Sequence, residues 1–179
     1  QLLWPLLDRL IARRYRAIFG GRLRLAVSGG APLSPEVARL FIGLGLNLIQ
    51  GYGLTEASPT VSVNRDYDND PASAGTRLPD VQIKMQQNGE LLVRGPGVMM
   101  GYWMDPDATA RAIDELGWLH TGDKVSRIER NRVYLTGRFK EIIVMSNGEK
   151  TPPTDMEQAI LLDPLFEQVM VVGEGRPYI

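Results

Sequence analysis

Leucine and isoleucine recur every three or four positions over the first eighteen residues, and arginines occupy positions between them. This period is that of an amphipathic α-helix. We expect the apolar face to pack against a protein core, with a helix lying on a membrane surface as the alternative. The apolar positions are Leu3, Leu6, Leu7, Leu10, Ile11 and Ile18.

The next segment alternates between strand and helix patterns. Residues 23–27 and 46–50 are short apolar runs, and the pattern between them is helical. Ser34 is a predicted N-cap, Pro35 fits the first helical position, and Gly45 can end the helix. A strand–helix–strand unit of this length predicts two parallel strands, with ligand-binding loops at their carboxyl ends.

From about residue 66 the pattern changes to short strands separated by turns. Strands are predicted over residues 81–85, 90–94 and 132–135, with one small helix that begins after Asp105 and ends at Gly117. After Gly137 we expect a strand over 142–145, a helix opened by the capping box of Thr154 and Glu157, and a strand over 169–172.

These patterns predict an α/β fold in three parts. A partial parallel α/β subdomain covers residues 1–66, and an antiparallel β-rich subdomain covers residues 67–137. The beginning of a small α+β domain covers residues 138–179.

Composition narrows the possible functions. The 179 residues are 44% apolar and carry a net charge of −1, which gives no basic excess for a nucleic-acid partner. The chain has no cysteine and one histidine, so thiolate and histidine-cluster metal sites are excluded. No segment has the length of a membrane span or the pattern of a secretory signal. A cytoplasmic location is the default expectation, with peripheral membrane association as the alternative.

Two glycine-rich segments follow the predicted parallel strands. The first, residues 28–33, reads Ser-Gly-Gly-Ala-Pro-Leu and is equally compatible with a plain turn. The second, residues 50–56, places Tyr52 between two glycines as a platform for stacking. In this segment, Thr55 could contact a phosphate and Glu56 could bind a magnesium ion. A glycine-rich turn with a capping threonine explains the same residues equally well. Neither segment is one of the usual nucleotide signatures.

Two further polar segments lie later in the chain. His120-Thr121-Gly122-Asp123 could use its aspartate to accept hydrogen bonds from a ribose, or that aspartate could simply form a turn. His120 itself is expected to be structural. Arg138 and Lys140 follow Gly137 and could meet ribose or phosphate, or be solvated surface charges.

In order and spacing, these four segments resemble the motifs of the AMP-forming adenylating superfamily, which includes acyl-CoA synthetases, peptide-synthetase adenylation domains and luciferases. Residues 89–95, 101–103 and 117–119 match as well, so the resemblance covers nearly the whole chain. Residues 52–64 and 149–173 look most like long-chain fatty acid–CoA ligases. Asp80 and Asn131 stand where the family more often has glycine, which does not threaten the site.

The resemblance implies a role for each motif residue. Gly30, Ala31 and Pro32 would form the adenine-side loop, Tyr52 would stack on adenine, and Gly51 and Gly53 would line the acyl pocket. Thr55 and Glu56 would be catalytic, Thr55 at the α-phosphate and Glu56 holding magnesium. Asp123 would bind the ribose with help from Arg138, Lys140 would be the hinge of the small domain, and Gly148 would line the CoA tunnel.

The implied reaction joins a carboxylic acid to ATP, with Mg²⁺, and passes the acyl group from an acyl-adenylate to coenzyme A. The alternatives are an acyl-acyl carrier protein synthetase and a non-catalytic AMP-binding module. The family's phosphate loop and catalytic lysine are not in this sequence. We therefore expect an internal piece of an enzyme that is inactive by itself and pairs with a second copy through an exposed strand edge.

Overall fold

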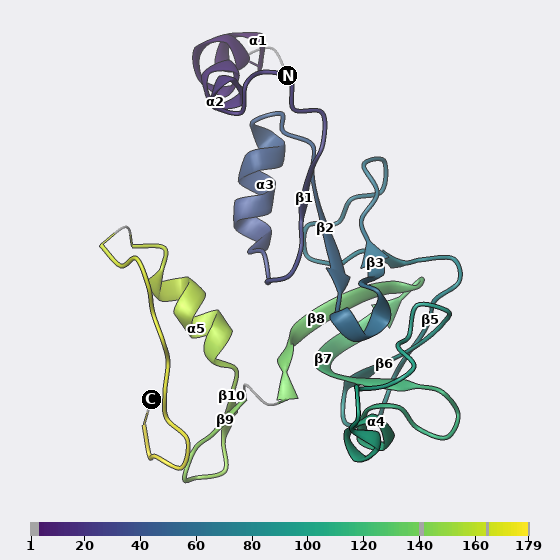
Figure 1. The fold of residues 1–179 in the computed structure, drawn as a ribbon. Coiled ribbons are helices and arrows are strands. Elements are labelled where there is room, and N and C mark those ends of the chain that lie inside the picture. Colours follow the sequence, from purple (N-terminus) through teal and green to yellow (C-terminus); the bar gives the residue numbers. More distant parts are fainter. Residues whose placement is uncertain (1–3, 140–141, 164, 179) are drawn as a thin grey trace. The chain divides into compact units, whose positions relative to one another are not determined.

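The computed structural model describes residues 4–139, 142–163 and 165–178 of the chain. They form a mixed α/β fold with a large, mostly antiparallel sheet, which confirms the predicted fold class (Figure 1). The chain divides into two compact units. Unit 1 comprises Gln1–Gln82, Gly95–Met99 and Glu129–Val133, and unit 2 comprises Ile83–Arg94, Met100–Ile128 and Tyr134–Ile179. The predicted boundaries near residues 66 and 137 stay a prediction.

Unit 1 contains the predicted parallel pair. Strand β1 (Ala26–Ser28) runs parallel to β2 (Leu48–Gly53), and helix α3 (Pro35–Gly43) connects them and lies alongside (Figure 1). The Ser34 hydroxyl accepts a hydrogen bond from the Val37 amide, so the predicted N-cap is confirmed. The first strand begins at Ala26 rather than at residue 23, because only residues 26–28 pair with β2.

The first residues are helical, as predicted, over α1 (Trp4–Leu7), the π-helical turn η1 (Asp8–Ala12) and α2 (Arg13–Ile18). Within the described residues of this chain, the apolar face of this segment is exposed, so the core against which it was expected to pack is not formed by them. The helical segment contacts the rest of unit 1 with its opposite face. On that face Ala12 is buried, and the Arg16 side chain donates a hydrogen bond to the Leu44 carbonyl at 2.8 Å. The exposed apolar residues are Leu6, Leu7, Leu10, Ile11, Tyr15 and Ile18.

The antiparallel part of unit 1 continues from β2. Strand β3 (Thr60–Val63) pairs with β2 on one side and with β4 (Thr76–Arg77) on the other. Thr76 in turn pairs with Arg132, the first residue of β8 (Arg132–Arg138). Asn131, just before β8, has a φ of 65°, which confirms that asparagine takes the left-handed turn there.

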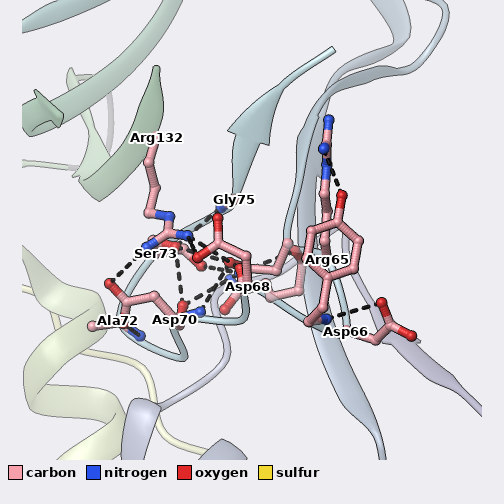
Figure 2. Close-up of polar contacts among 11 residues, drawn as sticks. Arg65, Asp66, Asp68, Asp70, Ala72, Ser73, Gly75 and Arg132 are labelled. Atoms are coloured by element: carbon pink, nitrogen blue, oxygen red, sulfur yellow. Dashed lines mark hydrogen bonds and ion pairs between the residues drawn. The ribbon is translucent and has the colours of Figure 1, made fainter. Parts of the chain in front are cut away.

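A buried polar network holds the loop between β3 and β4. The Asn64 amide nitrogen donates to the carbonyl of Ser73 at 2.8 Å and to that of Gln50 at 3.3 Å. Figure 2 shows Arg132 reaching the same loop, where its guanidinium lies 2.7 Å from the Asp68 carboxylate and 3.8 Å from that of Asp70. Asn64 therefore ties this loop to Gln50 in β2, the first residue of the second glycine-rich segment.

Unit 2 is built on four antiparallel strands in the order β8-β7-β6-β5. They are β5 (Gln82–Met85), β6 (Glu90–Arg94), β7 (Leu119–Glu129) and β8. Their core contains Leu91, Leu92, Val93, Leu119, Val125 and Tyr134, all of them buried. Apolar residues of this kind on adjacent strands supply most of the stabilisation of a small sheet.

Helix α4 (Pro106–Ala112) begins as predicted, because the Asp105 carboxylate accepts from the Ala108 amide at 2.8 Å. It ends at Ala112, five residues before the predicted end. Ile113 is already extended and forms a bridge with Leu119, and Asp114 then caps the turn that leads to β7.

The last part of unit 2 contains β9 (Ile143–Val144), its antiparallel partner β10 (Lys150–Thr151) and α5 (Pro153–Ile160). The capping box of Thr154 and Glu157 is wrong, because the helix begins at Pro153 and the Glu157 carboxylate accepts from the Val171 amide. Residues 169–172 do not form the predicted strand.

Candidate nucleotide site

The second motif lies at the end of β2 rather than in a loop after it. Gly51 pairs with Val63 and Tyr52 with Ser62, but the register shifts at Gly53, which pairs with Thr60. This bulge leads into the 3₁₀ turn η2 (Thr55–Ala57). Bulges of this kind often lie beside functional sites, because they change the direction in which side chains point.

The neighbouring backbone lies close to both glycines that flank Tyr52, but it forbids a side chain only at Gly53. A Cβ on Gly53 would overlap the Pro59 carbonyl oxygen and lie 2.7 Å from the carbonyl carbon. A Cβ on Gly51 would lie 3.3 Å from the Ser62 carbonyl oxygen. Close passage of the chain therefore accounts for Gly53, whereas a side chain at Gly51 would only make a tight contact. The role of both glycines in an acyl pocket stays a prediction.

Thr55 and Glu56 are held by backbone contacts. The Met99 amide donates to the Glu56 carbonyl at 2.8 Å, and the Leu54 amide donates to the Pro59 carbonyl at the same distance. Thr55 is exposed and Glu56 is half-buried. A hydroxyl and a carboxylate are thus presented side by side from a turn whose backbone is fixed.

The first motif lies next to the second within unit 1. Ser28 is paired with Gln50, and a Cβ on Gly29 would be 3.4 Å from the Gly51 carbonyl oxygen. Gly30, Ala31 and Pro32 follow in an exposed turn, in which Gly30 has a φ of 82°. The structure therefore brings together the predicted adenine-side loop and the segment that carries Tyr52.

The third motif is part of strand β7, so the alternative that Asp123 simply forms a turn is wrong. Thr121 and Asp123 are buried, and Gly122 between them has a φ of 69°. Opposite this segment, Leu92 pairs with His120 and Glu90 with Lys124, so β7 carries two extra residues. The bulge is the reason that the segment looks like a loop in the sequence although it belongs to a strand.

Asp123 and Arg138, which are adjacent on β7 and β8, form an ion pair. The Arg138 Nε atom lies 2.7 Å from Asp123 Oδ1. The carboxylate side chain is 7% exposed, whereas that of the arginine is 53% exposed. The two residues predicted to meet a ribose are thus in direct contact.

Glu90 is a polar residue of this region that sequence reasoning did not single out. Its carboxylate accepts from the Gly122 amide at 3.0 Å and lies 3.2 Å from His120 Nδ1. The segment around Glu90 was part of the resemblance, but a glutamate at the start of a strand gives no signal of this contact. The expectation that His120 is structural stays a prediction, and its contact with Glu90 is compatible with it.

The roles predicted for all of these site residues stay predictions, and this includes the hinge and the CoA-tunnel position. Lys140, the predicted hinge, lies outside the described residues. Gly148 lies in an exposed turn between β9 and β10, has a φ of 83°, and has no atom near the position of a Cβ. Among the described residues, no cluster of three or more histidine, aspartate or glutamate side chains could hold a metal ion by itself.

Comparison with known proteins decides the family. Residues 5–103 match the AMP-binding enzyme family, and residues 140–179 match the AMP-binding enzyme C-terminal domain. The chain belongs to the AMP-binding enzyme family. The second match begins at residue 140, the position predicted as the hinge.

Individual members of the family cover nearly all of the chain. It is 40% identical over 172 residues to the long-chain-fatty-acid–CoA ligase FadD15 of Mycobacterium bovis, which is 96% of the chain and 28% of that relative. It is 33% identical over 181 residues to the long-chain-fatty-acid–CoA ligase ACSBG1 of Rattus norvegicus, which is 97% of the chain and 25% of that protein. The chain thus spans about a quarter of the length of these relatives.

The AMP-binding fold is also found in solved structures. ATP-bound MatB from Rhodopseudomonas palustris is 29% identical with a TM-score of 0.67, over 76% of this chain and 29% of that one.

Within the part of the chain that the structure describes, no helix is both long enough and apolar enough to cross a bilayer.

Proposed function

We propose that the complete protein carrying this chain is an ATP-dependent ligase that joins a carboxylic acid to coenzyme A through an acyl-adenylate. The acid is a long-chain fatty acid. The observation that carries the proposal is the 40% identity to a long-chain-fatty-acid–CoA ligase over 96% of the chain. The ion pair of Asp123 and Arg138 and the fixed turn at Thr55 and Glu56 support it.

In the proposed reaction, an oxygen of the acid's carboxylate attacks the α-phosphorus of ATP and pyrophosphate leaves. The acyl carbon is then attacked by the thiol of coenzyme A, and AMP leaves. Such a reaction depends on positioning and charge neutralisation and needs no protein nucleophile. Thr55 donates its hydroxyl to an α-phosphate oxygen, and Asp123 accepts hydrogen bonds from the ribose hydroxyls.

A magnesium ion fits the residues present. Magnesium is usually held by one or two carboxylates together with substrate phosphates rather than by a cage of protein ligands. Glu56 offers one half-buried carboxylate next to the Thr55 hydroxyl, and the described residues contain no larger acidic or histidine cluster. When bound, the ion would neutralise charge on the pyrophosphate leaving group.

Pyrophosphate exchange by the complete protein tests this function. We expect exchange of labelled pyrophosphate into ATP to depend on the added acid and to be faster with long-chain than with short-chain fatty acids. A second measurement, with either coenzyme A or an acyl carrier protein as acceptor, identifies the thiol. Absence of exchange with every acid tested would contradict the proposal, and equal rates with all chain lengths would contradict the long-chain assignment.

A further inference from the structure

The bulge in β7 leaves backbone groups that the strand ladder does not satisfy. Leu92 pairs with His120 and Glu90 pairs with Lys124, so three residues of β7 stand opposite Leu91 alone. Amides in such a bulge lack the regular partner that a paired strand supplies. Buried backbone donors without any partner are costly, so these groups need another acceptor.

Side chains supply the missing contacts. Glu90 Oε1 accepts from the Gly122 amide at 3.0 Å. The Thr121 hydroxyl donates to the Leu91 carbonyl at 2.7 Å and accepts from the Asp123 amide at 3.1 Å. Glu90 and Thr121 therefore hold the bulge from its two sides.

The Glu90 carboxylate is well placed for this role. Its side chain is 13% exposed, and its second oxygen lies 3.2 Å from His120 Nδ1. The carboxylate thus contacts both neighbours of Thr121, which are His120 and Gly122. Hydrogen bonds to a charged acceptor in a partly buried position are stronger than those between neutral groups.

We propose that Glu90 is a positioning residue of the nucleotide site, which fixes the β7 bulge so that the Asp123 carboxylate is held where it accepts from the ribose hydroxyls. This inference rests on the proposed function, since it takes the ribose as the partner of Asp123. Glu90 itself makes no contact with the nucleotide. Its effect is transmitted through the backbone of Gly122, the residue immediately before Asp123.

The test compares binding of ATP and of 2′,3′-dideoxy-ATP to the complete protein by calorimetry. The wild type is expected to bind ATP at least tenfold more tightly than the dideoxy analogue, because the analogue lacks the hydroxyls. In Glu90→Ala this preference should fall about tenfold, which corresponds to about 1.4 kcal/mol, while the affinity for the analogue changes little. A general folding defect would weaken binding of both nucleotides.

Matched variants complete the test. Glu90→Gln keeps an oxygen that can accept from the Gly122 amide and should retain the preference within about twofold. Glu115→Ala removes an exposed glutamate of the same unit and should have no effect. If Glu90→Ala does not fold, Glu90→Asp replaces it, because the shorter side chain withdraws the carboxylate from Gly122.

The outcomes separate the two proposals. A wild type that binds both nucleotides equally well would overturn the ribose role of Asp123, and with it this inference. The inference alone would be overturned if the wild type prefers ATP and the Glu90→Ala or Glu90→Asp variant keeps the same preference. The ribose role of Asp123 would then still stand. Loss of the preference in Glu90→Gln to the same extent as in Glu90→Ala would also contradict it.

Discussion

Replacing Gly53 by alanine tests whether the bulge at the end of β2 depends on close passage of the backbone. The added Cβ would overlap the Pro59 carbonyl oxygen, and it would lie 2.7 Å from the Pro59 carbonyl carbon and 3.0 Å from Thr60 Cα. Non-bonded carbon atoms pack at about 3.5–4.0 Å. All three obstructing atoms belong to the backbone, so no rotation of a side chain relieves the overlap.

The expected loss of stability follows from these contacts. Overpacking costs about 1–3 kcal/mol, and loss of the 2.8 Å hydrogen bond from Leu54 to Pro59 adds about 1 kcal/mol, for a total of about 2–4 kcal/mol. The turn that carries Thr55 and Glu56 would shift as well. A displacement of about 1 Å in a positioning group can lower a rate about a hundredfold.

Urea unfolding followed by circular dichroism measures the stability, and pyrophosphate exchange measures the rate. Gly43→Ala is the matched control. Gly43 ends helix α3 and has no atom within 4 Å of the Cβ position, so alanine there should be neutral or stabilise by up to about 1 kcal/mol. If Gly53→Ala and Gly43→Ala had the same free energy of unfolding, backbone crowding would not be the reason for Gly53.

Three further predictions concern the proposed reaction of the complete protein. Glu56→Gln should lower pyrophosphate exchange by roughly a thousandfold through loss of a metal-holding carboxylate, and a near-normal exchange rate would refute the metal assignment. Asp123→Ala should weaken ATP binding in calorimetry by about 1.5–3 kcal/mol for each ribose hydrogen bond lost, and unchanged affinity would refute the ribose role. Lys140→Pro should leave adenylation intact while thioester formation falls sharply, whereas equal loss of both half-reactions in separate assays would argue against a hinge.

Local signals predicted much of the fold. Strand β6 has the bounds predicted for it, and the N-caps Ser34 and Asp105 were identified from residue type and the proline that follows each. These features depend on neighbours in the sequence, so they can be read from it. The parallel pairing of β1 and β2 also followed from the connecting helix.

Features that depend on distant partners were not predictable in this way. Residues 120–123 contain histidine, glycine and aspartate, which do not favour strands, yet they lie in β7 because β6 pairs on both sides of them. Conversely, residues 169–172 favour strands but do not form one, and the Val171 amide donates to the Glu157 side chain instead. The contact of Glu90 with Gly122 joins residues 32 positions apart, and no local pattern reveals it.

The second and third motifs lie where a strand ladder is interrupted. The register shifts at Tyr52 and Gly53 in β2, and again opposite Thr121–Asp123 in β7. In a regular ladder, the backbone amides and carbonyls are hydrogen-bonded to the neighbouring strands, and side chains alternate strictly between the two faces of the sheet. An interruption changes the direction of Asp123 and of the turn after Gly53, while the paired residues on either side keep the backbone rigid. Gly53 and Gly122 are therefore explained first by the backbone geometry of the bulges, and the polar residues beside them are the ones for which a chemical role has to be tested.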